Sequence, residues 1–90
     1  MARKRYHLII KEACPYCQRA IELLDSKGLV YNLDPMDEEL ELLREIKESL
    51  KYDTVPMIWE IDHLGAKTFI GGYSQLASLL QYKDKELLRG

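Results

Sequence analysis

The stretch that decides the fold is YHLIIKEACPYC, residues 6–17, which joins a short apolar run to both cysteines of the 90-residue chain. Residues 6–10 are largely apolar and β-branched toward their end, which suits a buried strand of a parallel or mixed sheet. Pro15 fits the first turn of a helix, and Gly28 fits the left-handed position that ends one. The pattern therefore predicts a strand, a cysteine loop and a helix over residues 15–27.

Turn residues and β-favouring runs predict three more strands, at residues 29–33, 55–61 and 67–70. The first of these ends at Asp34-Pro35, and a turn that contains Gly65 joins the other two. Asp37 is expected to cap a second helix, in which an apolar stripe lies among many charges. The stripe consists of Leu40, Leu43, Ile46 and Leu50. A third helix follows Gly71-Gly72 and is expected to end near Tyr82.

The predicted order is β-α-β-α-β-β-α, an α/β fold in a single domain over residues 1–90. A strand, a crossover helix and a second strand form a right-handed unit with parallel pairing. The later hairpin adds antiparallel strands, so we expect a four-stranded mixed sheet with helices on both faces. Loops that follow the carboxyl ends of strands share one rim of such a sheet, and the cysteine loop is one of them.

Composition excludes several classes of function. A hydrophobic content of 47% with few prolines and glycines indicates a compact fold. A net charge of −2, without a run of either sign long enough for a nucleic-acid footprint, argues against nucleic acid as a partner. The basic N-terminus leads into an apolar run of only four residues, too short for a signal peptide or a membrane span. We therefore expect a soluble, cytoplasmic protein that does not bind membranes.

The cysteine pair favours redox chemistry over a structural role. A disulfide across a two-residue gap closes almost no chain and stabilises little, and cytosolic proteins seldom carry structural disulfides. A zinc site needs four ligands, and His7 and His63 are poorly placed to complete one with the cysteines. A CxxC motif beside a βαβ pattern is instead typical of thioredoxin-like redox proteins.

The two cysteines are expected to differ in chemistry. Cys14 precedes the helix, where unpaired N–H groups and the positive end of the dipole stabilise a thiolate, so we expect it to be the nucleophile. Cys17 lies one turn further, on the apolar stripe, where burial raises the pKa of a thiol. We therefore expect Cys17 to be the resolving thiol, and Lys11 can add a positive charge near the pair.

Three motifs in order resemble those of dithiol glutaredoxins. They are CPYC at residues 14–17, TVP at residues 54–56 and GGYSQL at residues 71–76. The resemblance covers nearly the whole chain and implies a thioredoxin-like fold, glutathione-dependent reduction of disulfide or glutathionylated proteins, and no metal cofactor. It also implies a monomer. The glutathione-binding residues that it implies are Lys11, Tyr16, Thr54, Val55, Pro56, Gly72, Tyr73 and Ser74.

The resemblance assigns a part of glutathione to several of these positions. Pro56 is expected to be cis, which exposes the Val55 backbone for strand-like pairing with a bound cysteinyl peptide. The N-terminus of the last helix, at Gly72 and beyond, is expected to hold the γ-glutamyl carboxylate. Lys11 matches the lysine that meets the glycyl carboxylate. Tyr16 either walls the glutathione groove or only shields the sulfur.

The chain departs from the family at a few positions. Ser74 stands where the family often has aspartate, Met57 stands where a polar residue is frequent, and the segment between Pro56 and Gly71 is longer. Small viral members tolerate such variation, so a phage-type source is compatible with the sequence.

Two alternative functions keep the same fold. One is a redoxin that a flavoprotein reductase reduces and that serves ribonucleotide reductase. The other is a carrier in which Cys14 of two subunits and two glutathione molecules hold a [2Fe–2S] cluster. The second is disfavoured, because members of that kind usually have a CGFS-like loop without the second cysteine.

Overall fold

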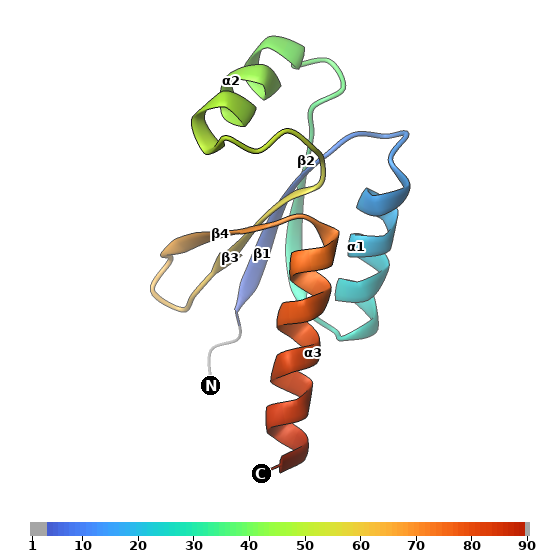
Figure 1. Ribbon diagram of the computed structural model, residues 1–90, viewed down its shortest axis with the longest axis vertical. Helices are drawn as coiled ribbons and strands as arrows, with labels where there is room; N and C mark the ends of the chain where they lie inside the picture. Colours follow the sequence, from blue (N-terminus) through green and yellow to red (C-terminus); the bar gives the residue numbers. More distant parts are fainter. Residues whose placement is uncertain (1–3, 90) are drawn as a thin grey trace.

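The structure, a computed structural model, describes the backbone of residues 4–89 and the side chains of residues 4–81. It confirms the predicted α/β architecture and element order (Figure 1). The elements are β1 (Arg5–Ile10), α1 (Pro15–Ser26), β2 (Val30–Pro35), α2 (Leu40–Leu50), β3 (Met57–Ile61), β4 (Lys67–Gly71) and α3 (Tyr73–Arg89). No helix within these residues is long and apolar enough to cross a membrane.

The four strands form one mixed sheet in the order β2-β1-β3-β4. Strand β1 pairs in parallel with β2, as a βαβ crossover through α1 requires, with Tyr6 beside Tyr31 and Leu8 beside Leu33. Strands β3 and β4 form the predicted hairpin and add antiparallel pairs. The central place of β1 directs its carboxyl end, and the cysteine loop that follows, to the rim where β2 also ends.

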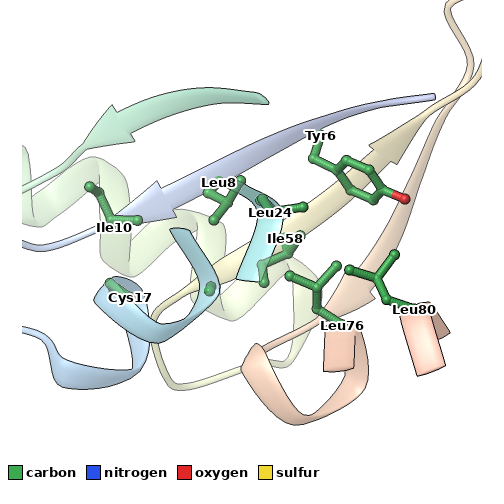
Figure 2. Packing of buried hydrophobic residues seen from close by; sticks show 9 residues of the cluster. Tyr6, Leu8, Ile10, Cys17, Leu24, Ile58, Leu76 and Leu80 are labelled. Carbon is green, nitrogen blue, oxygen red and sulfur yellow. The ribbon is translucent and has the colours of Figure 1, made fainter. Parts of the chain in front are cut away.

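Alternation along β1 distributes its side chains between two hydrophobic clusters. The larger cluster lies between the sheet and the helices α1 and α3, which contact each other (Figures 1 and 2). Its members are Tyr6, Leu8, Ile10, Cys17, Ala20, Leu24, Ile58, Leu76 and Leu80. On the opposite face, Ile9, Met36 and Met57 pack against Leu43 of α2. Helices therefore cover both faces of the sheet, as predicted.

Strand β2 and helix α2 differ in detail from the prediction. Strand β2 continues through Pro35, because it is an edge strand and a proline there removes no hydrogen bond from the middle of the sheet. The expectation that Asp37 caps α2 is wrong, since the residue before the helix is Glu39, which makes no side-chain cap. The carboxylate of Asp37 instead accepts a hydrogen bond from the backbone N–H of Glu12.

The predicted end of the last helix near Tyr82 is also wrong, because α3 continues to Arg89. The apolar stripe weakens after Tyr82, and this weakening suggested an end. The segment KDKELLR nevertheless consists mostly of good helix formers and contains no glycine or proline, so nothing in it stops the helix.

Strands β3 and β4 are joined by the turn predicted over residues 62–66. The carboxylate of Asp62 accepts hydrogen bonds from the N–H groups of Leu64 and Ala66 at 2.9 and 3.0 Å, which closes the turn. Gly65 has φ +87°, a conformation that side-chain-bearing residues rarely adopt. The hairpin tip thus depends on one carboxylate and one glycine.

The face of the sheet that carries Trp59 also contains a polar cluster around His7. The Nδ1 atom of His7 lies 2.9 Å from the ammonium of Lys67, and its Nε2 atom lies 3.7 Å from a carboxylate oxygen of Asp34. Partial burial, and next the charge of Lys67, lower the pKa of His7, while Asp34 acts in the opposite direction. Only a neutral imidazole can accept a hydrogen bond from Lys67, so the cluster favours the uncharged ring.

Core packing predicts a large loss of stability for Leu24→Ala. Leu24 is fully buried between α1 and the sheet, so its truncation leaves a cavity and should lower the free energy of unfolding by about 2–5 kcal/mol. The control is Leu64→Ala, because Leu64 is 82% exposed at the hairpin tip and should change stability by less than about 0.5 kcal/mol. Equal urea midpoints for the two variants would contradict the described core.

The lowered pKa of His7 predicts a specific dependence of stability on pH. The unfolded chain takes up a proton near the ordinary histidine value of 6.5, whereas the folded chain resists it. The contribution of His7 is therefore present above pH 6.5 and is lost as the pH falls through the folded pKa. Urea unfolding at pH 7.5 and 5.5 should show a larger loss for the parent than for His7→Gln. Equal losses would contradict the prediction.

Candidate functional site

The sulfur of Cys14 lies at the N-terminus of α1. Cys14 is the cap residue, with an extended backbone (φ −139°, ψ 103°), and Pro15 occupies the first turn, where its missing N–H costs no hydrogen bond. The Sγ atom accepts a hydrogen bond from the N–H of Cys17 at 3.2 Å. A thiolate here therefore receives a backbone donor and faces the positive end of the helix dipole, as the sequence predicted.

The TVP segment lies beside this sulfur. The Val55–Pro56 peptide bond is cis, as the family resemblance implied. The carbonyl oxygen of Val55 lies 3.7 Å from Sγ of Cys14, within reach of the thiol proton. Two segments 41 residues apart in sequence thus meet at the reactive atom.

Cys17 lies behind Cys14 in the core. Its side chain has no exposed surface and belongs to the cluster between the sheet, α1 and α3 (Figure 2). Burial raises the pKa of the Cys17 thiol well above its usual range, and the hydrogen bond with Cys14 acts in the same direction. Both cysteines are free thiols, with Cys14 partly exposed. The predicted difference in environment between the two is confirmed.

A groove of about 320 Å³ opens beside Cys14, and we refer to it as the thiol groove. It lies between the start of α1, the TVP segment and the start of α3. The predicted site residues that line it are Tyr16, Thr54, Val55, Pro56, Gly72, Tyr73 and Ser74. Tyr52 and Gln75 also line it, although the sequence analysis did not select them. The fold therefore brings the three sequence motifs to one surface.

Two neighbouring tyrosines line the thiol groove. Tyr16 is 54% exposed, and its ring centre lies 6.1 Å from that of Tyr73. The guanidinium carbon of Arg19 lies 5.1 Å from the Tyr16 ring centre, close enough for a cation–π contact that helps to orient the ring. Tyr16 thus stands as a wall of the groove, which was one of its two expected roles.

The start of α3 also contributes backbone groups to the groove. The N–H of Gly72 donates a hydrogen bond to the side-chain oxygen of Gln75 at 2.9 Å, as in half of a capping box. The N–H groups of Tyr73 and Ser74 belong to the first helical turn and have no carbonyl partner within the helix. Tyr73 and Ser74, more than Gly72, therefore present donors to an anion in the groove.

Gly72 is required by the close approach of Tyr52. A Cβ atom on Gly72 would lie 2.5 Å from the hydroxyl oxygen of Tyr52, whereas the φ of Gly72 itself is unremarkable for an L-residue. The Tyr52 ring is held edge-on against Phe69, with centres 5.2 Å apart. The glycine thus makes room for a residue of the groove wall.

Of the predicted site residues, neither cysteine is part of the lining of the thiol groove, and the remaining residue outside the lining is Lys11. It lies in the loop before Cys14, half-buried, and forms no ion pair with any side chain of residues 4–81. Among the same residues, no group of three or more His, Cys, Asp or Glu side chains is arranged to hold a metal ion.

The two overlooked residues differ in how they could have been found. Gln75 is three residues after Gly72, the spacing of a capping box, so the sequence did contain a signal for it. Tyr52 follows the second helix in a loop without any motif. Tyr52 belongs to the site only because the folded loop packs its side chain against Gly72.

The Tyr52 contact predicts the behaviour of Gly72→Ala. The added methyl group should displace the Tyr52 ring and lower the free energy of unfolding by about 1–3 kcal/mol. Tyr52→Phe removes the atom that the methyl group would meet, so the double variant should recover part of the loss. Thermal unfolding of the two single variants and the double variant measures this coupling. Additive effects would show that Tyr52 does not restrict position 72.

Comparison with known proteins agrees with this geometry. The family model described as Glutaredoxin matches residues 7–63. Glutaredoxin 3 of Escherichia coli K12 is 39% identical over 56 residues, which cover 61% of this chain and 68% of that protein. The glutaredoxin of Pseudomonas aeruginosa PAO1 is 38% identical over 66 residues, which cover 73% of each chain.

Solved structures agree on the fold. The crystal structure of glutaredoxin 1 from Francisella tularensis complexed with cacodylate has a TM-score of 0.67 at 20% identity, with 98% of this chain and 100% of that chain covered. The solution structure of glutaredoxin from Brucella melitensis has a TM-score of 0.66 at 24% identity, with 93% and 86% covered. With a family match over more than half of its residues and a close Cys14–Cys17 pair, the chain belongs to the glutaredoxin family of thiol–disulfide oxidoreductases.

Proposed function

We propose that this glutaredoxin depends on glutathione and reduces both protein disulfides and glutathione mixed disulfides. The observation that carries the proposal is the position of Cys14 Sγ. This atom accepts a hydrogen bond from the N–H of Cys17 and lies beside the thiol groove, which Tyr16 and Val55 line. A nucleophilic thiolate needs stabilisation, access and an adjacent surface that holds its substrate. The surroundings of Cys14 supply each of these.

The reaction of a glutathionylated protein begins at Cys14. The Cys14 thiolate attacks the glutathione sulfur, the old S–S bond breaks, and the protein leaves as a thiolate that takes up a proton. The enzyme then carries a Cys14–glutathione disulfide. A second glutathione thiolate attacks the glutathione sulfur of this bond, which releases glutathione disulfide and restores the Cys14 thiolate. The net reaction consumes one free glutathione, which leaves in glutathione disulfide together with the glutathionyl group of the substrate.

A protein disulfide requires Cys17. After Cys14 has formed a disulfide with one cysteine of the substrate, the Cys17 thiol loses its proton and attacks Cys14, which releases the second substrate thiol. The product is a Cys14–Cys17 disulfide, and two glutathione molecules then reduce it. The hydrogen bond between Cys17 N–H and Cys14 Sγ keeps the two residues within one helical turn, which supports this role.

The thiol groove offers a fitting surface for glutathione. We assign the cysteinyl backbone to Val55, next to the cis bond of Pro56, and the γ-glutamyl carboxylate to the N–H groups of Tyr73 and Ser74. Lys11, which has no carboxylate partner among the described side chains, remains available for the glycyl carboxylate. Tyr16, Thr54 and Gly72 complete the walls.

Cysteine variants test the proposed roles. Cys14→Ser should lose activity toward a glutathionylated peptide and toward a protein disulfide, because a serine hydroxyl is a far weaker nucleophile. Cys17→Ser should keep most of its activity toward the glutathionylated peptide, since a second glutathione resolves that intermediate, but should lose reduction of the protein disulfide. The assay couples release of glutathione disulfide to glutathione reductase and NADPH.

Two controls accompany this experiment. Thioredoxin reductase with NADPH, in place of glutathione, tests whether another electron source reduces the protein equally well. Tyr31→Phe, distant from the groove on β2, should leave both activities unchanged. Full activity of Cys14→Ser, or reduction by thioredoxin reductase but not by glutathione, would overturn the proposal.

A further inference from the structure

Asp37 connects the segment before α2 to the loop that carries Cys14. Both of its carboxylate oxygens lie within hydrogen-bond distance of the backbone nitrogen of Glu12, at 3.0 and 3.2 Å. The two residues are 25 positions apart in sequence. Glu12 lies two residues before Cys14, in the loop that precedes α1. The carboxylate of Asp37 therefore holds this loop from a different part of the chain.

The segment that carries Asp37 is itself anchored. The N–H of Met36 donates a hydrogen bond to the carbonyl oxygen of Ile10 at 3.0 Å, which extends the pairing of β1 and β2 by one step. The Met36 side chain is buried against Leu43 and Met57. In Figure 1 this segment runs past the end of the sheet where β1 passes into the cysteine loop. Asp37 therefore acts from a fixed position.

A carboxylate here also affects the electrostatics of the dithiol. The negative charge of Asp37 adds to the rise in the pKa of Cys17, although burial is the main cause. Reduction of the Cys14–Cys17 disulfide creates a thiolate at Cys14, two residues after the Glu12 N–H that the Asp37 carboxylate bonds, whereas the disulfide is uncharged. A nearby fixed negative charge therefore disfavours the reduced state relative to the disulfide.

We propose that Asp37 is a positioning residue of the dithiol site, which tethers the cysteine loop through Glu12 N–H and shifts the dithiol–disulfide equilibrium toward the disulfide through its charge. The first role depends on geometry and the second on charge, so two substitutions separate them. Asp37→Asn keeps an oxygen acceptor for Glu12 but has no charge. Asp37→Ala has neither. The proposal rests on the dithiol chemistry proposed above, but not on a particular reductant.

The experiment measures the equilibrium of each variant with a glutathione redox buffer. In this reaction the enzyme dithiol and glutathione disulfide give the enzyme disulfide and two glutathione molecules, and mass spectrometry after alkylation counts both enzyme forms. Asp37→Asn should lower the equilibrium constant for disulfide formation by about two- to threefold, a small change because solvent screens the charge of this exposed carboxylate. The matched control is Glu38→Gln, because Glu38 is the next residue and is exposed like Asp37, whereas only Asp37 is hydrogen-bonded to the cysteine loop.

The tether is measured separately. Exchange of the Glu12 amide hydrogen in the parent should be slowed relative to that of an open loop, should stay slowed in Asp37→Asn and should become fast in Asp37→Ala. Asp37→Ala should also have a lower kcat/KM than Asp37→Asn toward a glutathionylated peptide. If Asp37→Ala does not fold, two measurements still test the proposal. They are the exchange rate of the Glu12 amide in the parent protein and the dithiol–disulfide equilibrium constant of Asp37→Asn.

Several results would overturn the proposal. An unchanged equilibrium in Asp37→Asn, or an equal shift in Glu38→Gln, would refute the charge role. Fast exchange at Glu12 in the parent would refute the tether. A parent that equilibrates with dithiothreitol but not with glutathione counts against glutathione dependence instead, and the same Asp37 measurements can then be made in the dithiothreitol buffer.

Discussion

The hydrogen bond from Cys17 N–H to Cys14 Sγ is the interaction on which the site depends. It exists because Cys14 is in extended conformation at the cap of α1, so that its sulfur meets the first free N–H groups of the helix. The same arrangement directs Cys17 into the core. One local geometry therefore creates an accessible sulfur with a backbone donor and a buried sulfur one turn away. The rest of the fold fixes where this pair points.

Three connections meet around that helix start. The cis bond before Pro56 brings the Val55 carbonyl to Cys14, the start of α3 supplies N–H donors across the groove, and Asp37 holds the loop at Glu12. Each connection lies next to the start or end of a strand or helix, so the rigid elements set the geometry while the loops carry the chemistry. The cost of ordering these loops is offset by the two hydrophobic clusters on either side of the sheet.

The sequence allowed the fold class and the order of elements to be predicted, because strand and helix periodicities are strong where one face is buried, and the resemblance of its motifs to glutaredoxins implied most of the groove residues. The prediction from sequence was wrong where the same local pattern is compatible with two structures. Asp37 has the residue type and the position expected of a helix cap. Its carboxylate nevertheless accepts a hydrogen bond from the backbone N–H of Glu12, a residue distant in sequence. The apolar stripe weakens in the charged segment after Tyr82, yet the high helix propensity of its residues carries α3 to Arg89. Tyr52 had no signal, since its role arises only from contact with Gly72.

The sequence by itself determined the unequal cysteines, because the two-residue spacing, the proline between them and the apolar stripe fix which sulfur caps the helix and which one enters the core. It also determined the turn at Asp62 and Gly65, where a carboxylate and a positive φ act within five residues. Only the tertiary structure decided which distant groups reach Cys14. Helical and turn interactions span a few residues and leave a pattern in the sequence, whereas contacts such as Val55 with Cys14 or Asp37 with Glu12 depend on how the strands are ordered in the sheet.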